Sequence, residues 1–237
     1  MIGMILLAVL AALIFFGATS HFFSEMGVAN WVAFLVVFGV ALAAVFPPLR
    51  FYGGVSFSYA GFFAPLLIGL FMFFSVLKSG GILRTLAGIP AVAGIVLAAR
   101  ISFPPFTNSI PSMLIIGLVG GVAAFLVGRS RIAMLASVLL GIVLGDVIAT
   151  LLFRYVLGTA TILPFGQYGI FDAFVLGVLV AGFTTEMVGM IAGAMHRQRV
   201  STMPVATAIE AGKDNAFNPD TLYEDEDFDE YFNDDID

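Results

Sequence analysis

Three acidic residues, Asp146, Asp172 and Glu186, lie within strongly apolar stretches of this sequence. An ionised side chain in the hydrocarbon core of a membrane costs on the order of 2.5–3.5 kcal/mol on insertion scales. Each acid in such a place needs a basic partner, water or a proton. Because acids inside membrane segments often mark the route of a proton, an ion or a polar solute, these three residues are the first candidates for chemistry.

Helical spacing relates one of these acids, Asp146, to a nearby basic residue. Asp146, Thr150 and Arg154 recur at intervals of four and therefore share one face of a helix. Arg100 ends a different apolar stretch, on what we expect to be the same side of the membrane. We therefore predict that Asp146, Asp172, Arg100 and Arg154 converge near one surface of the molecule.

Two interpretations of these charges are open. In the structural one, two ion pairs fasten the helices together while Arg100 and Arg154 extend toward the surface. In the functional one, the acids form a site for a small ion or polar solute. Fourteen residues at about 100° each bring Glu186 to within roughly 40° of Asp172, so Glu186 would be a deeper stage of a proton or cation path.

A third interpretation is intramembrane proteolysis by paired aspartates, in which two carboxylates share a proton and activate water. Gly145-Asp146 and Phe171-Asp172 resemble the GxGD and YD elements of intramembrane aspartyl proteases. Val143 departs from the first element, which has glycine there, and the two elements occur here in the reverse order.

The composition excludes a water-soluble globular domain. Hydrophobic residues make up 60% of the 237 residues and charged residues 11%, and a single soluble core could not hide so much apolar surface. Cysteine is absent and there are two histidines, so we expect no thiol nucleophile, no disulfide and no metal site. We also expect no cofactor, since phosphate-loop and dinucleotide fingerprints are missing. No nucleic-acid partner is expected.

Long apolar runs predict about seven membrane-spanning helices, given that a span needs roughly 20 residues. The fold class is therefore an all-α, polytopic transmembrane bundle. The fourth and fifth runs are short, and we expect them to be little tilted or partly re-entrant. The runs are 2–18, 28–46, 60–77, 85–100, 113–128, 132–153 and 170–195.

The distribution of Lys and Arg predicts the orientation, because cytoplasmic loops are enriched in them. An N-terminus outside and a C-terminus inside follow, with an odd number of spans. The predicted cytoplasmic side holds Lys78, Arg84, Arg129, Arg131, Arg197, Arg199 and Lys213, and the outer side holds Arg50, Arg100 and Arg154.

The three outer loops, at 47–54, 103–108 and 163–169, share Pro and aromatic residues, and the first and third also contain Gly. Pro and Gly interrupt helices, whereas Phe and Tyr suit the membrane interface. One interpretation is a set of tight turns with aromatic anchors. The other is a partly re-entrant outer vestibule, which requires that the irregular backbone be covered by protein or line water.

Three predicted spans contain pairs of glycines four residues apart. Small residues at this spacing let two helix backbones approach closely. The pairs indicate helix packing and a possible homo-oligomer. They are Gly117 with Gly121, Gly141 with Gly145, and Gly189 with Gly193.

The C-terminal segment differs in composition from the rest. All but four of the sixteen acids lie within it, and such acid density opposes a packed core. We predict a transmembrane domain at 1–200 and a disordered, acidic cytoplasmic tail at 201–237. A cytoplasmic protein could bind the tail at 223–237, with Phe228, Tyr231 and Phe232 as anchors.

The stretch Arg131–Asp146, followed by Gly166–Phe174, resembles an uncharacterised family of prokaryotic polytopic membrane proteins. In that family a GAD-like element in one helix precedes a GGAG-x-FD-like turn that opens the last helix. Gly145 replaces the alanine of the first element, and Gln167 and Tyr168 interrupt the turn of the second. The resemblance implies a multi-pass protein of a prokaryotic plasma membrane and focuses interest on Asp146 and Asp172, and it supplies no reaction.

Our functional hypothesis is a small permease or channel-like protein for an ion or small polar solute. The alternative is a non-catalytic assembly or scaffold protein that recruits a cytoplasmic partner through its tail, and the third is the aspartyl protease. The permease hypothesis assigns roles to Asp146, Asp172, Glu186, Arg100, Arg154 and Thr150.

Overall fold

The computed structural model describes residues 2–17, 23–24, 26–51, 54–79, 81–103, 110–128, 130–158 and 162–201. The chain divides into two compact units, Met1–Gly189 and Met190–Asp237. In the second unit, the described residues form the last turns of a helix that ends at Ser201. The acidic tail was predicted at 201–237, and all of it after Ser201 lies outside the described residues.

Each of the seven predicted runs corresponds to one helical segment among the described residues, and the prediction of an all-α helical membrane bundle is confirmed. Three of the segments include a π-helical stretch, labelled η. The helices are α1 (Ile2–Phe15), α3 (Asn30–Val45), η1 (Tyr59–Phe63) with α4 (Ala64–Ser79), α5 (Ile82–Ser102), α6 (Ile110–Leu114) with η2 (Ile115–Val119) and α7 (Gly120–Gly128), α8 (Arg131–Leu151) with η3 (Leu152–Val156), and α9 (Ile170–Ser201).

The prediction that the fourth and fifth spans are short was wrong. Among the described residues, five helices are long and apolar enough to cross a membrane, and these two have 21 and 19 residues. The fourth continues beyond the apolar run at both ends, and Pro90 lies inside it, as membrane helices tolerate. The two shorter apolar helices are instead α1, with 14 residues, and α3, with 16.

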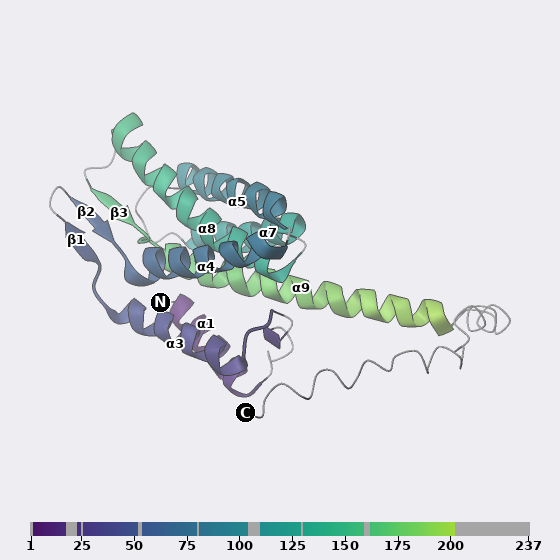
Figure 1. Ribbon diagram of the computed structural model, residues 1–237. Coiled ribbons are helices and arrows are strands. Elements are labelled where there is room, and N and C mark those ends of the chain that lie inside the picture. Colours follow the sequence, from purple (N-terminus) through teal and green to yellow (C-terminus); the bar gives the residue numbers. More distant parts are fainter. Residues whose placement is uncertain are drawn as a thin grey trace, which may run out of the picture. The chain divides into compact units, whose positions relative to one another are not determined.

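Helix α8 forms the centre of the first unit. Within its span, Arg131–Val156, 72% of the most apolar 18-residue stretch is buried inside the protein. The corresponding share is 22–39% in the other four candidate spans. Ser130 caps its start, because its side-chain oxygen accepts a hydrogen bond from the amide of Ala133 at 3.2 Å. Helices α4, α5 and α7 pack against α8 (Figure 1).

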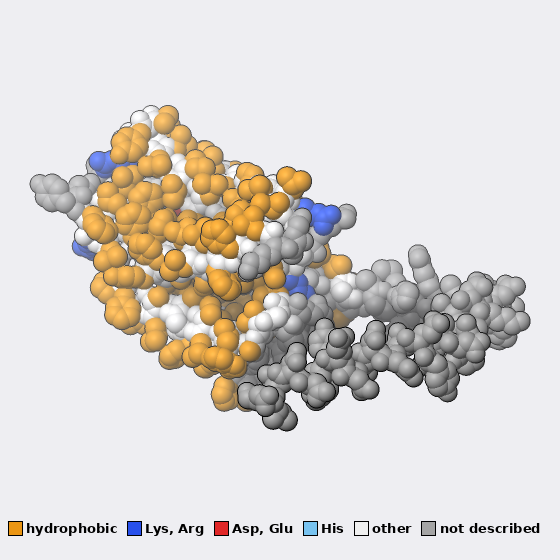
Figure 2. Space-filling view, in the orientation of Figure 1, with side chains coloured by type: hydrophobic (Ala, Val, Ile, Leu, Met, Phe, Trp, Pro, Cys, Tyr) orange, Lys and Arg blue, Asp and Glu red, His pale blue; other side chains and the backbone are white. Residues whose placement is uncertain are grey.

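The surface of the first unit is largely apolar. Figure 2 shows hydrophobic side chains over most of the visible described surface, with the basic side chains in a few isolated places. Large side chains such as Phe71, Leu83 and Trp31 are more than 65% exposed. An exposed apolar surface of this extent fits lipid and does not fit water, so the chain is a membrane protein whose helices contact the bilayer.

A small three-stranded sheet lies at one end of the bundle and was not predicted. β1 (Leu49–Phe51) pairs antiparallel with β2 (Val55–Phe57), and β2 pairs parallel with β3 (Leu163–Phe165). Two loops that are more than 100 residues apart in sequence thus satisfy each other's backbone groups. Phe57 stacks on Phe165 across the sheet, with ring centroids 4.9 Å apart. These two loops are therefore joined to each other by backbone pairing.

Candidate functional site

A buried ion pair joins α5 to α8 close to the sheet. Nη2 of Arg100 lies 3.2 Å from Oδ1 of Asp146, and the two residues are 5% and 2% exposed. A buried carboxylate or guanidinium is costly unless its partner and further hydrogen bonds compensate for lost water. Arg100, which lies in the last turn of α5, is the countercharge that contacts Asp146.

The second oxygen of Asp146 binds the chain segment that follows β3. Oδ2 accepts a hydrogen bond of 2.7 Å from the backbone amide of Gly166. Arg100 also donates from Nη2 to the carbonyl of Gln167 at 3.2 Å, and the Gln167 side chain donates to the hydroxyl of Ser56 at 2.8 Å. The ion pair therefore holds one turn of chain in place, and this turn is connected in its own right to β2.

The turn Gly166–Gly169 has an unusual backbone. Gly166, Tyr168 and Gly169 all have positive φ angles, of 71°, 51° and 84°. Residues other than glycine rarely adopt such angles. At Gly166 a side chain would also meet the backbone of Gly61 and Phe62 at 2.6 Å. The bend of the chain thus favours glycine at 166 and 169, and the close approach to η1 also requires it at Gly166.

Asp172 lies in the first turn of α9 and contacts a different helix. Its Oδ1 accepts a hydrogen bond of 2.7 Å from the amide of Gly3, in the first turn of α1. Amides in the first turn of a helix have no acceptor inside that helix, so Asp172 caps α1 from outside. Gly3 is needed there, because a Cβ atom would lie 2.9 Å from the Cα of Asp172.

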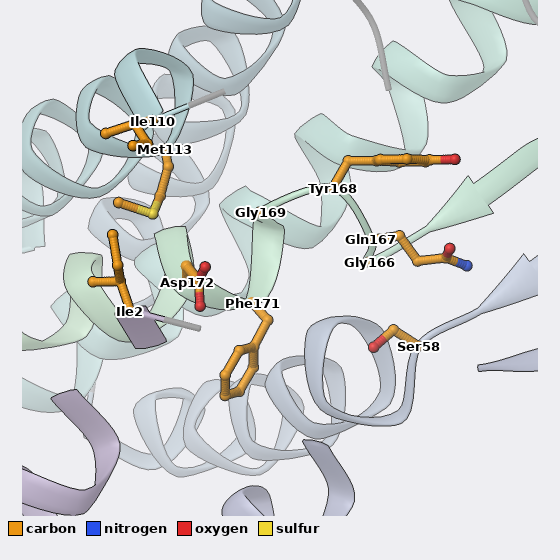
Figure 3. A pocket seen from close by; sticks show the side chains of 10 residues that line it. All are labelled: Ile2, Ser58, Ile110, Met113, Gly166, Gln167, Tyr168, Gly169, Phe171 and Asp172. Carbon is orange, nitrogen blue, oxygen red and sulfur yellow. The ribbon is translucent and has the colours of Figure 1, made fainter. Parts of the chain in front are cut away.

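A pocket of about 390 Å³ opens beside this carboxylate. Figure 3 shows the carboxylate of Asp172 between the turn and the side chains of Met113 and Ile2, while the side chains of Gln167 and Tyr168 point away from it. The lining consists of Ile2, Ser58, Ile110, Met113, Gly166, Gln167, Tyr168, Gly169, Phe171 and Asp172.

The predicted stripe of Asp146, Thr150 and Arg154 is interrupted. Thr150 is 2% exposed within α8, but Arg154 lies in η3, where a wider turn changes the angle between successive side chains. Arg154 is partly exposed, and its guanidinium lies 6.0 Å from the centre of the Tyr155 ring. The structure thus brings Arg100 to Asp146 and places Arg154 toward the surface.

Glu186 belongs to the opposite end of the bundle. It forms an ion pair with Arg131, with 3.0 Å between Oε1 and Nη2. Arg131 and Asp146 are 15 residues apart on α8, or about 22 Å at 1.5 Å per residue. Glu186 therefore has no place in the pocket beside Asp172.

The predicted packing glycines contact helices of the same chain. Gly141 and Gly145 lie against Val92 and Val96 of α5, and a Cβ atom at either glycine would meet those residues at 2.6 Å. Gly117 and Gly121 lie against α9 in the same way, at 2.7 Å from Leu176 and Gly177. Gly189 has no neighbour within 4 Å among the described residues, and the surroundings of Gly193 are outside them.

Several residues of the site were missed. The turn itself was noted in the sequence, but nothing indicated that the Gly166 amide and the Gln167 carbonyl would bind Asp146 and Arg100. Gly3 and Gly61 had no visible signal, because their role is to let distant backbone approach. Among the described residues, no group of three or more His, Cys, Asp or Glu side chains could hold a metal ion.

Comparisons of the chain with protein-family models, with curated proteins and with solved structures find no match.

Proposed function

We propose that this chain is a small permease or channel-like protein for an ion or small polar solute. The pocket beside Asp172 is the site at which the solute enters. The observation that supports this most is the pocket itself, which combines a carboxylate with the Gly166–Gly169 turn in an otherwise apolar molecule. Binding sites for small molecules are commonly apolar clefts with a few well-placed polar groups.

In this proposal, the ion pair of Arg100 and Asp146 positions the pocket and does not touch the solute. The pair holds the amide of Gly166 and the carbonyl of Gln167, which belong to the turn that lines the pocket. Thr150 and Arg154 follow Asp146 at intervals of four, on α8 and η3. We assign Glu186 no part in solute binding, because it pairs with Arg131 at the other end.

The geometry favours the permease over the aspartyl protease. A protease dyad needs two carboxylates that share a proton. Here Asp146 accepts from Arg100 and Gly166, whereas Asp172 accepts from Gly3 of α1. The scaffold alternative depends on the tail beyond Ser201, outside the described residues. The resemblance to prokaryotic polytopic proteins supports a plasma membrane location.

Flux into proteoliposomes tests the proposal. The full chain is reconstituted, and uptake of protons, Na⁺, K⁺, Cl⁻ and small organic cations is compared between wild type and Asp172→Asn. We expect uptake of at least one probe, reduced to the level of empty vesicles in the variant. Glu186→Gln is the matched control, with the same chemical change on the same helix, and should retain uptake.

Absence of uptake for every probe in folded wild type, or equal uptake in Asp172→Asn, would rule the proposal out. Circular dichroism before and after reconstitution checks that each variant is folded.

A further inference from the structure

An exposed basic side chain lies on the sheet at one end of the bundle. Arg50 is the middle residue of β1, the edge strand next to β2. Its side chain is exposed, and no described residue forms a hydrogen bond or ion pair with its guanidinium. On the left of Figure 2, at the end where Figure 1 draws the sheet, basic side chains lie among hydrophobic ones. The guanidinium of Arg50 is thus free to bind a group from outside the described chain.

Strand β1 begins shortly after a helix whose surface faces lipid. At the end of α3, Val45 and Phe46 are 73% and 64% exposed. Three residues separate Phe46 from Arg50, so the two are at most about 14 Å apart along an extended chain. The headgroup layer on each side of a bilayer is roughly 5–8 Å thick. Arg50 therefore lies within reach of this layer.

Tyrosines at the same end of the bundle support this placement. Tyr59, at the start of η1, lies against Phe46, with ring centroids 6.1 Å apart. Tyr155, on η3, is 71% exposed. Because tyrosine is enriched where lipid meets water, the end that holds the sheet has the composition of a membrane interface.

The sheet has an aromatic face and a face that carries Arg50. Successive residues of a strand point to opposite faces, so Phe51 lies on one face and Arg50 on the other. On the aromatic face, the ring of Phe57 lies 6.0 Å from that of Phe51 and 4.9 Å from that of Phe165. On the other face, Arg50 is opposite Ser56 in the register of β1 and β2. A sheet with two such faces suits the headgroup layer, where hydrocarbon and charge meet.

A phospholipid matches both the charge of Arg50 and its surroundings. The planar guanidinium of arginine presents five donors and binds phosphate through two parallel hydrogen bonds. The acyl chains of the same molecule would cover the exposed side chains of Val45 and Phe46, which lead into the strand. The described residues of the three strands include no Asp or Glu, so they do not repel an anionic headgroup.

We infer that β1 binds the headgroup of an anionic phospholipid, with the phosphate on Arg50 and the acyl chains along the end of α3. This lipid site lies outside the solute pocket and is independent of the proposed permease function.

Thermal unfolding of the full chain in a maltoside detergent tests this inference, because the headgroup of that detergent has no phosphate. Dioleoyl phosphatidylglycerol and dioleoyl glycerol, which lacks the phosphate, are added at rising concentration, since a ligand that binds the folded state raises Tm. We expect phosphatidylglycerol to raise Tm in a saturable way and dioleoyl glycerol to raise it much less. In Arg50→Gln the affinity for phosphatidylglycerol should fall at least about fivefold, the effect of one basic side chain near an anionic surface.

Arg84→Gln is the matched control, because Arg84 is also exposed but lies in the first turn of α5, at the other end of the bundle. It should bind phosphatidylglycerol like wild type. Equal stabilisation by dioleoyl glycerol or by soluble glycerol phosphate, unchanged affinity in Arg50→Gln, or the same loss in Arg84→Gln would overturn the inference.

A fluorescence measurement locates the lipid. The chain has one tryptophan, so Trp31→Phe combined with Phe51→Trp places the only indole next to Arg50. Phosphatidylglycerol brominated close to the headgroup should quench this indole, and the quenching should weaken when Arg50→Gln is added. Absence of quenching in the folded protein would contradict a lipid site on β1.

Discussion

Arg100 and Asp146 meet across two helices, with 3.2 Å between Nη2 and Oδ1 and less than a tenth of either residue exposed. Each also binds the turn after β3, so the pair connects α5, α8 and the rim of the pocket. Removing one member would leave the other buried without its countercharge.

Asp146→Ala should therefore destabilise the protein by about 3–5 kcal/mol, as for other broken buried pairs. Replacement of both residues, by Arg100→Met with Asp146→Leu, should restore much of this loss, because no uncompensated charge remains. Reversible unfolding in detergent, followed by circular dichroism, measures both effects.

Glu186→Ala is the matched control for that experiment. The side chains of Arg131 and Glu186 are 16% and 35% exposed, and partly exposed pairs contribute about 0–1 kcal/mol. Equal losses for Asp146→Ala and Glu186→Ala would contradict the central role of the buried pair.

Gly61→Ala should disrupt the contact between η1 and the turn that lines the pocket. A Cβ atom at Gly61 would meet the backbone carbonyl of Gly166, and backbone cannot move aside as a flexible side chain can. We expect a loss of about 3 kcal/mol, together with weaker solute binding, because the Gly166–Gly169 turn must shift. Gly39→Ala in α3, where no neighbour lies within 4 Å, is the control. A variant at Gly61 with wild-type stability would show that the two segments are not in close contact.

Gly145→Ala should weaken the packing of α5 on α8. The new Cβ atom would meet Val96 at 2.6 Å and the carbonyl oxygen of Ala93 at 2.8 Å, which predicts a loss of about 1–3 kcal/mol from overpacking. Gly94→Ala changes a glycine of α5 that faces open space and should be neutral or gain up to about 1 kcal/mol in helix propensity. The difference between the two midpoints of thermal unfolding measures the effect. Equal midpoints for the two variants would show that Gly145 lies outside the interface between α5 and α8.

Single cysteines test the orientation, since the chain has none of its own. Leu157 follows η3 at the end that holds the sheet, and Leu83 lies in the first turn of α5 at the other end; both are more than half exposed. With the sheet outside, a membrane-impermeant maleimide should label Leu157→Cys in intact cells and Leu83→Cys after permeabilisation. The reverse labelling pattern would show that the sheet faces the cytoplasm.

The sequence by itself determined which parts of the chain form helices. Runs of apolar residues must satisfy their backbone hydrogen bonds internally in lipid, and this local requirement does not depend on how the helices later pack. It also made Asp146 and Asp172 conspicuous, because a charge in an apolar run is costly wherever the helix lies. The length of the fourth helix was underestimated, since Arg84 and Arg100 ended the apolar count without ending the helix. The fifth helix begins at Ile110, three residues before the predicted run.

Tertiary structure decided the partners of those charges. Arg100 rather than Arg154 reached Asp146, and the π-helical turn η3 altered the spacing on which the other expectation depended. The sheet that pairs 55–57 with 163–165, the contact of Gly61 with Gly166, and the cap that Asp172 places on α1 all join segments far apart in sequence. Such contacts depend on the register and the distance between packed helices, and no local pattern in one sequence records these quantities.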